Sequence, residues 1–195
     1  IALSLVGSEM CIRDRRIGLL FSAPAGNDLL FDIKLCEQGK NFSNKIWNAF
    51  RLINGFETSN EKDQELHEIA AIKWFNEELN LKINDINNAF DKFKISEALM
   101  ITYKLVWDDF CSTFLEIVKP KFGEKISQKT ITEINSLFNK ILSILHPFMP
   151  FISSEIQSKF IHKDQNLEWP KSRNADNKII GNFEHVNELI TKAVS

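Results

Sequence analysis

The chain contains few of the residues that interrupt regular structure: seven glycines and five prolines among 195 residues. Glycine and proline form most tight turns, so their scarcity disfavours a β-sandwich or barrel of many short strands. Sixteen phenylalanines against one tyrosine, and a hydrophobic content of 44%, indicate an aromatic-rich core and exclude a disordered chain. A chain of this length suits one domain or slightly more. We therefore expect an all-α helical bundle.

Cysteine is scarce too. The three cysteines, Cys11, Cys36 and Cys111, are odd in number, widely spaced and without a CxxC pair. This pattern is typical of the reducing cytoplasm and predicts neither a disulfide framework nor a zinc site. No apolar run approaches the roughly 18 residues of a membrane span. The short apolar run at the N-terminus is broken by Gly7 and lacks the preceding basic segment of a signal peptide. We expect a cytoplasmic protein that does not bind a membrane.

Neither sign of charge is in excess. The sequence has 24 lysines and arginines and 26 aspartates and glutamates, for a net charge of -2. Such a protein has no global positive field to attract nucleic acid, so any nucleic-acid contact would have to use a local patch.

The signatures of common active sites are absent as well. The sequence holds no GxxxxGK[ST] or GxGxxG phosphate loop and no HExxH motif. Its four histidines lie far apart and do not pair with cysteines or carboxylates at the spacing of metal ligands. Asp108 and Asp109 are adjacent, so on a helix they point in different directions and do not form a catalytic pair by themselves. We expect no catalytic residue and no metal in this chain.

Residues 41–54 are the most informative stretch. Apolar residues recur there at helical spacing and predict a helix with one buried face. These residues are Phe42, Ile46, Ala49, Phe50 and Ile53.

A second stripe on the same helix is unusual, because a plain solvated face would carry lysine and glutamate. It consists of Asn44, Trp47, Asn48 and Arg51, with Lys45 beside them. Amides read base edges, aromatic rings stack on bases, and arginine binds phosphate or guanine. The alternative is structural: Trp47 packs in the core, the amides are caps or surface groups, and Arg51 pairs with Asp108 or Asp109 of another helix.

The remaining periodicity places further helices, with Pro120 ending the third. The expected helices span residues 32–54, 66–90, 96–119, 130–146, 152–160 and 183 onward. We expect Leu66 on the apolar face of its helix, Ser96 and Asn182 as N-caps, and Gly55 as a left-handed C′ residue. Trp169 is expected to be pinned onto the bundle.

Four stretches, in this order and spacing, resemble the C-terminal part of bacterial valyl-tRNA synthetases. They are GLLFSAPAGNDLLFD (Gly18–Asp32), NKIWNAFRL (Asn44–Leu52), YKLVWDDFCSTFLEIVKP (Tyr103–Pro120) and LHPFMPFISSEI (Leu145–Ile156). Three positions depart from the family pattern. Leu52 stands where the family usually has an aromatic residue, and Ser154 and Gln157 stand in the region where a second acidic residue and a tryptophan are common.

The resemblance implies a class I aminoacyl-tRNA synthetase fragment containing the helical anticodon-binding bundle. Valine activation with ATP and Mg²⁺ would belong to a catalytic domain whose HIGH and KMSKS signatures are absent here, so the fragment alone should be inactive and without a cofactor. The partners would be valine tRNA and that catalytic domain, in a monomeric enzyme. Asn44, Lys45, Trp47, Asn48 and Arg51 would lie at or near the tRNA.

The same resemblance divides the chain. Residues 16–31 would be the connection from the catalytic domain, 32–162 the anticodon-binding bundle, and 163–195 a polar connection and the start of a final helix. Residues 1–15 do not fit the family, and the string from Ser4 to Arg15 looks like a translated sequencing adaptor. The alternative for this segment is a genuine N-terminal helix.

Two other functions stay open at this point. The chain could be a stand-alone helical module that binds a protein, which its near-neutral charge allows. It could also be the same domain of an isoleucyl- or leucyl-tRNA synthetase, since these enzymes share the bundle.

Overall fold

The computed structural model describes residues 15–21, 33–159 and 168–194. The hypotheses about residues 4–14 and most of the 16–31 connection fall outside these ranges. The elements are α2 (Ile33–Asn54), β1 (Thr58–Ser59), α3 (Leu66–Asp91), α4 (Ile95–Lys104), the π-helix η1 (Leu105–Phe114), α5 (Leu115–Val118), β2 (Ile126–Ser127), α6 (Gln128–Leu145), α7 (Pro150–Lys159) and α8 (Asn177–Val194). Residues 15–21 are helical as well. The prediction of an all-α fold is confirmed.

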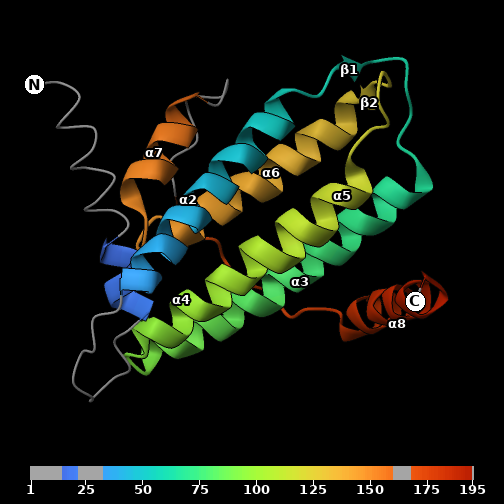
Figure 1. The fold of residues 1–195 in the computed structure, drawn as a ribbon. Helices are drawn as coiled ribbons and strands as arrows, with labels where there is room; N and C mark the ends of the chain where they lie inside the picture. The colour runs from blue at the N-terminus through green and yellow to red at the C-terminus, as the bar shows by residue number, and fades with distance from the viewer. Residues whose placement is uncertain (1–14, 22–32, 160–167, 195) are drawn as a thin grey trace, which may run out of the picture.

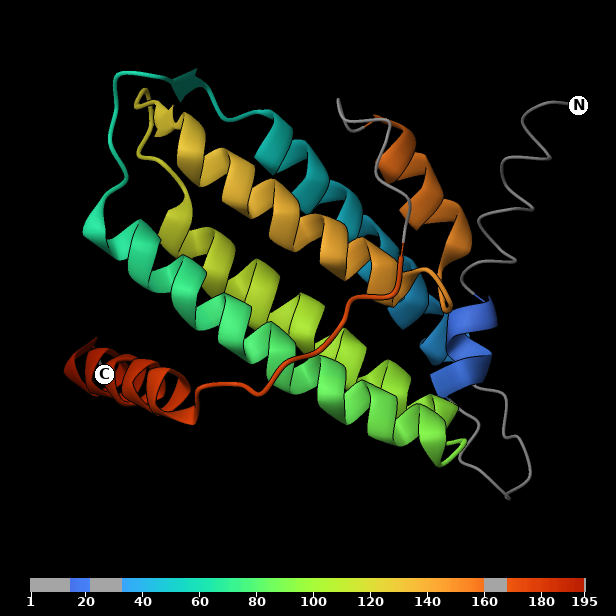
Figure 2. The ribbon, with the colours of Figure 1, turned by 180° about the vertical axis from the view of Figure 1, so that it is seen from behind.

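The long helices form a bundle (Figures 1 and 2). α2 and α6 run side by side, and α3 runs beside the continuous α4–η1–α5 helix. α7 lies against α2 and α6, whereas α8 packs on α3 at the other side of the bundle. None of the helices within the described ranges is long and apolar enough to cross a membrane.

Stacked phenylalanines join the layers of the core. Phe110 of η1 stacks on Phe138 of α6 with ring centroids 5.4 Å apart. Phe75 of α3 stacks on Phe114 of η1 at 4.8 Å. All four rings are buried, so the aromatic content expected to form a core does so. The apolar stripe predicted for residues 41–54 is also buried along its whole length.

The third predicted helix is continuous, but its middle is a ten-residue π-helix, η1. Two hydroxyls bond carbonyls five residues earlier, which stabilises this wider turn. Ser112 Oγ donates to the Trp107 carbonyl at 2.8 Å, and Thr113 Oγ1 donates to the Asp108 carbonyl at 3.1 Å. Sequence periodicity does not separate a π-helix from an α-helix over so short a stretch.

Several local predictions were wrong. α8 begins at Asn177, six residues before the predicted start, because Asp176 Oδ1 accepts the Lys178 amide at 3.0 Å and caps the helix in place of Asn182. The amide of Gly55 bonds the last carbonyls of α2 without a left-handed backbone; in the described part of the chain only Phe93 and Gly123 have positive φ.

The helix starts of α3 and α4 also differ from the prediction. α4 begins at Ile95 with Lys94 as N-cap, so Ser96 is the second residue of the helix rather than its cap. Leu66 is 86% exposed, because it is the first residue of α3 and lies beyond the edge of the core. The prediction for Trp169 is confirmed: its Nε1 donates to Asn87 Oδ1 at 2.9 Å, and its ring meets Phe90 edge-on at 5.7 Å.

Two short strands, β1 and β2, form a parallel pair that the sequence did not predict. Thr58 pairs with Ile126 and Ser59 with Ser127. This pair fixes the link after α2 against the start of α6, at the end of the bundle where α2 ends (Figure 1).

Candidate nucleic-acid interface

The second stripe of α2 is open to solvent. Asn44, Asn48 and Arg51 are exposed, and Lys45 and Trp47 are half-buried on the two flanks of the stripe. The cause is the opposite face: since the apolar stripe packs against η1, α6 and α7, the amides and the guanidinium must point outward.

Each flank of the stripe is joined to a neighbouring helix by a cation held over an aromatic ring. The Lys45 ammonium lies 5.0 Å from the ring centroid of Trp107 in η1. On the other side, the Lys159 ammonium of α7 lies 5.0 Å from the ring centroid of Trp47. These distances are within the range of cation–π attraction. The stripe, Trp107 and Lys159 together are called the three-helix surface below.

The two tryptophans combine packing and exposure. Trp47 is half-buried, with its ring centroid 5.5 Å from that of buried Phe50. Trp107 stacks on Tyr103, at 5.5 Å with an interplanar angle of 16°. Trp47 therefore packs at the edge of the core and also borders the surface, so a packing role does not exclude contact with a nucleic acid. Both rings are partly exposed.

Arg51 makes no ion pair with Asp108 or Asp109 among the ion pairs of the described residues. The reason is helical phase. Lys45 reaches Trp107 of η1, and Arg51 lies about 120° around the helix from Lys45. The structural alternative for Arg51 is therefore not realised, and its exposed guanidinium is available to a ligand.

Sequence reasoning missed two members of the three-helix surface. Trp107 precedes Asp108 and Asp109 in the sequence, but nothing in the sequence linked it to α2. Lys159 gave no signal at all, because its place beside Trp47 depends on how α7 packs on α2.

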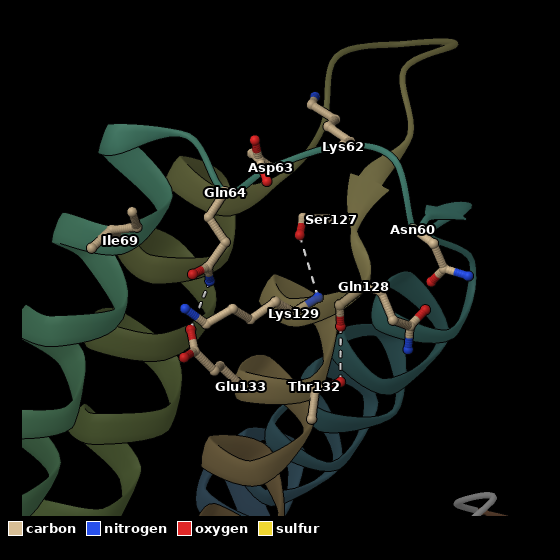
Figure 3. Close-up of a pocket in the computed structure, with 10 residues that line it drawn as sticks. All are labelled: Asn60, Lys62, Asp63, Gln64, Ile69, Ser127, Gln128, Lys129, Thr132 and Glu133. Carbon is tan, nitrogen blue, oxygen red and sulfur yellow. Dashed lines mark hydrogen bonds between the residues drawn. The ribbon is translucent and has the colours of Figure 1, made fainter.

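A pocket of about 770 Å³ opens at the β1–β2 end of the bundle (Figure 3). Its wall combines amides, hydroxyls, charges of both signs and one apolar side chain. The lining residues are Asn60, Lys62, Asp63, Gln64, Ile69, Ser127, Gln128, Lys129, Thr132 and Glu133. They come from the link before α3, the first turn of α3 and the start of α6, which is why no single stretch of sequence predicted the pocket.

A buried polar network holds the starts of α3 and α6 together beside this pocket. Glu68 is 3% exposed, and its Oε2 accepts the Thr130 hydroxyl at 2.9 Å and the Glu65 amide at 3.0 Å. Across the pocket, Gln64 Nε2 donates to Glu133 Oε2 at 2.8 Å. The Glu68 carboxylate of α3 accepts from α6, and the Glu133 carboxylate of α6 accepts from the link before α3, so both bonds join the two helix starts.

The charged groups near the pocket are partly engaged with one another. Lys62 Nζ lies 2.9 Å from Glu65 and 3.7 Å from Glu124. The hydrogen bond to Glu65 raises the pKa of Lys62 and lowers that of the Glu65 carboxyl. Lys129 is exposed and makes no ion pair within the described ranges. The described residues bring together no group of three or more His, Cys, Asp or Glu side chains that could hold a metal ion.

Comparison with known proteins gives these features a context. Residues 72–195 match the family described as the anticodon-binding domain of tRNA ligase. The chain is 45% identical over 180 residues to valine–tRNA ligase of Christiangramia forsetii and 41% identical over 180 residues to that of Porphyromonas gingivalis. In both cases 90% of this chain and 20% of the relative are covered. Valine–tRNA ligase of Carboxydothermus hydrogenoformans is 33% identical over 81% of this chain and 19% of its own length.

The chain thus spans about one fifth of the length of the curated relatives it matches. The family match covers α4 to α8 and most of α3, and the relatives extend the similarity over nearly the whole chain. On this evidence, and with the helical bundle that it folds into, the chain belongs to the anticodon-binding domain family of tRNA ligases.

Proposed function

We propose that this chain is the anticodon-binding part of a valine–tRNA ligase. It holds valine tRNA in register while a catalytic domain elsewhere in the longer enzyme joins valine to the acceptor end. The family match and the names of the relatives support this proposal. ATP and Mg²⁺ belong to the catalytic domain, and the enzyme is a cytoplasmic monomer.

This part of the enzyme contributes binding energy and no chemistry. Binding energy from groups remote from the reaction orients the substrate, and correct orientation lowers the barrier at the distant catalytic site. Asn44, Lys45, Trp47, Asn48 and Arg51 contact the tRNA in this proposal. The exposure of the stripe on α2, between two cation–aromatic pairs, is the observation that supports this assignment.

The chemistry of the three-helix surface suits RNA. Lys45 and Lys159 supply positive charge for phosphates, and Lys159 also pairs with Glu155 at 2.8 Å. Each ammonium lies over the face of a tryptophan ring, Lys45 over Trp107 and Lys159 over Trp47. Arg51 and the two asparagines between them present hydrogen-bonding groups to base edges or to phosphates. Such a local patch is what a chain of net charge -2 requires to bind a polyanion.

Filter binding of the chain to valine tRNA over a salt series tests the proposal. Affinity should fall linearly with salt on logarithmic axes, because bound phosphates release counterions. Lys159→Ala should make the slope less steep by about one, whereas Lys73→Ala, an exposed lysine on α3, should leave it unchanged. Absence of salt-dependent binding at low ionic strength would contradict the proposal and favour the protein-interaction module.

Two substitutions of Arg51 distinguish a base contact from a phosphate contact. Arg51→Ala should weaken binding by about 1–3 kcal/mol if the side chain reads a base. Arg51→Lys should then be as weak, because lysine lacks the planar two-pronged donor; if Arg51 binds a phosphate, Arg51→Lys should retain most of the affinity. An unchanged affinity with a lower melting temperature would assign Arg51 to the scaffold.

Competition with isoleucine and leucine tRNAs tests whether the chain prefers valine tRNA over the tRNAs of the two related synthetases.

A further inference from the structure

We propose that Ser112 and Thr113 are positioning residues for the three-helix surface. Their hydroxyls hold η1 in its π-helical turn, and this turn places the Trp107 ring next to the Lys45 ammonium. The inference rests on the proposed function and extends it, because neither hydroxyl belongs to the three-helix surface. Three observations support it: the burial pattern of η1, the hydrogen bonds inside it and the contacts of Trp107.

The buried residues of η1 include two adjacent pairs that are five residues apart. Leu105 and Val106 form the first pair, and Phe110 and Cys111 form the second. An α-helix has about 3.6 residues per turn, so it would set the two pairs about 140° apart around the axis. A π-helix bonds residues five apart and brings them toward one face. The wide turn therefore lets both pairs point into the core.

The side-chain hydrogen bonds of the chain differ between η1 and the α-helices. In α4 and α6, Thr102 Oγ1 and Thr132 Oγ1 each donate to a carbonyl four residues earlier, both at 2.8 Å. In η1, the Ser112 and Thr113 hydroxyls donate to carbonyls five residues earlier. Since the wide turn brings those carbonyls into reach, these two bonds stabilise the π turn relative to an α turn.

The π turn acts directly on Trp107. The carbonyl that accepts the Ser112 hydroxyl belongs to Trp107 itself. Three residues further along, Phe110 is fixed in the core between one ring of α3 and one of α6, each with its centroid 5.4 Å away. Because Phe110 is held, a change from the π turn to an α turn would rotate Trp107 about the helix axis. The ring would then move away from the Lys45 ammonium, which lies 5.0 Å from its centroid.

A lysine held over a ring is better prepared to bind a phosphate than a lysine that moves freely. A free lysine side chain loses rotamer freedom when it binds, whereas the Lys45 side chain is already restrained by Trp107. The number of charges on the surface is the same in both cases, so the π turn changes affinity through position alone. Ser112 and Thr113 therefore act on RNA binding through Trp107 and Lys45, without touching the RNA themselves.

NMR of the chain without RNA tests whether the two hydroxyls place Trp107. The methylene group next to the Lys45 ammonium lies near the Trp107 ring, whose ring current shifts its signals upfield. Trp107→Leu identifies these signals, because it removes the shift. The double variant Ser112→Ala/Thr113→Val should lose the shift as well. Ser112 is exposed and Thr113 half-buried, so this variant should fold, which its melting temperature checks.

Two further variants serve as controls in the same spectrum. The exchange Ser112→Thr/Thr113→Ser keeps both hydroxyls and should keep the upfield shift. Thr132→Val removes an exposed hydroxyl that bonds a carbonyl of an α turn, so it should leave the Lys45 signals unchanged.

Filter binding to valine tRNA tests the consequence for RNA. The double variant Ser112→Ala/Thr113→Val should bind about 2- to 5-fold more weakly than the wild type, the factor that corresponds to one cation–π contact at an exposed site. The same two substitutions should have no effect in a Trp107→Leu background, because no contact with Lys45 is left to lose. The hydroxyl-exchange variant should bind like the wild type.

Several outcomes would overturn the inference. An unchanged upfield shift in the double variant would show that the hydroxyls do not place Trp107. A loss of affinity that persists in the Trp107→Leu background would show that Ser112 or Thr113 contacts the RNA directly. If the wild type binds valine tRNA and the double variant binds it equally well, the inference fails and the proposed function stands. If the wild type does not bind valine tRNA, the proposed function fails together with the inference.

Discussion

The hydrogen bond between Thr130 and Glu68 should be a main support of the pocket end of the bundle. Thr130→Val exchanges the hydroxyl for a methyl group of similar size, so packing is kept and only the donor is lost. Thr130 is fully buried and Glu68 is 3% exposed, so water cannot take the place of the missing hydroxyl. A hydrogen bond to a carboxylate contributes about 1.5–3 kcal/mol, and this contribution would be lost, since Glu68 Oε2 would keep only the Glu65 amide as a donor.

We therefore expect Thr130→Val to lower the free energy of unfolding by about 1.5–3 kcal/mol. For a chain of this size the loss corresponds to a decrease in melting temperature of about 3–12 °C. Urea unfolding followed by far-UV circular dichroism measures the first quantity, and thermal unfolding the second.

Thr132→Val is the matched control. Thr132 lies two residues further along α6 and is exposed, and its hydroxyl bonds the Gln128 carbonyl of its own helix at 2.8 Å. Its substitution should change stability by no more than about 0.5 kcal/mol. Equal effects of the two substitutions, or no loss in Thr130→Val, would refute the view that the buried bond to Glu68 supports this end of the bundle.

Further predictions concern other parts of the fold. Burial raises the pKa of the Cys111 thiol to about 12, so iodoacetamide at pH 8 should label it only after unfolding, as mass spectrometry would show. Gly18→Ala should destabilise by about 1–3 kcal/mol, because a Cβ there would lie 3.0 Å from two atoms of α2. Gly181→Ala, where a Cβ meets nothing within 4 Å, should stabilise α8 by up to about 1 kcal/mol in the same urea assay. Glu77→Gln weakens the 2.5 Å ion pair with Arg173 and should speed amide exchange in α8 but not in α2, at a cost of about 0.5–1 kcal/mol.

For three of these predictions, a specific result would contradict the reasoning. Rapid labelling of folded Cys111 would show that the thiol is not held in the core. A Gly18→Ala protein as stable as the wild type would show that residues 15–21 do not pack closely on α2. Uniform acceleration of exchange throughout Glu77→Gln would indicate global destabilisation rather than release of α8.

Much of the fold follows from local chemistry that the sequence displays. The apolar spacing of residues 41–54 predicted both the helix and its buried face, because a helix places residues three and four apart on one side. Pro120 was expected to end the third helix, and α5 does end at Val118. Most of the wrong predictions involve caps: Asp176 and Asn182 are both good capping residues, and sequence alone does not say which one the tertiary contacts of α8 select.

The candidate sites also contain some residues that helical spacing predicts and others that only helix packing brings together. By itself the sequence determined that Asn44, Asn48 and Arg51 lie opposite the buried face of the helix, because helical spacing places them there. It left open whether Trp47 packs in the core or borders the surface. Only the tertiary structure placed Lys159 beside Trp47 and brought Asn60 to Gln128, because these contacts join segments separated by many residues. Helical period acts over a few residues and can be read along the chain. A pocket or an interhelical pair depends on how whole helices pack, and that is decided by the shape of the entire core.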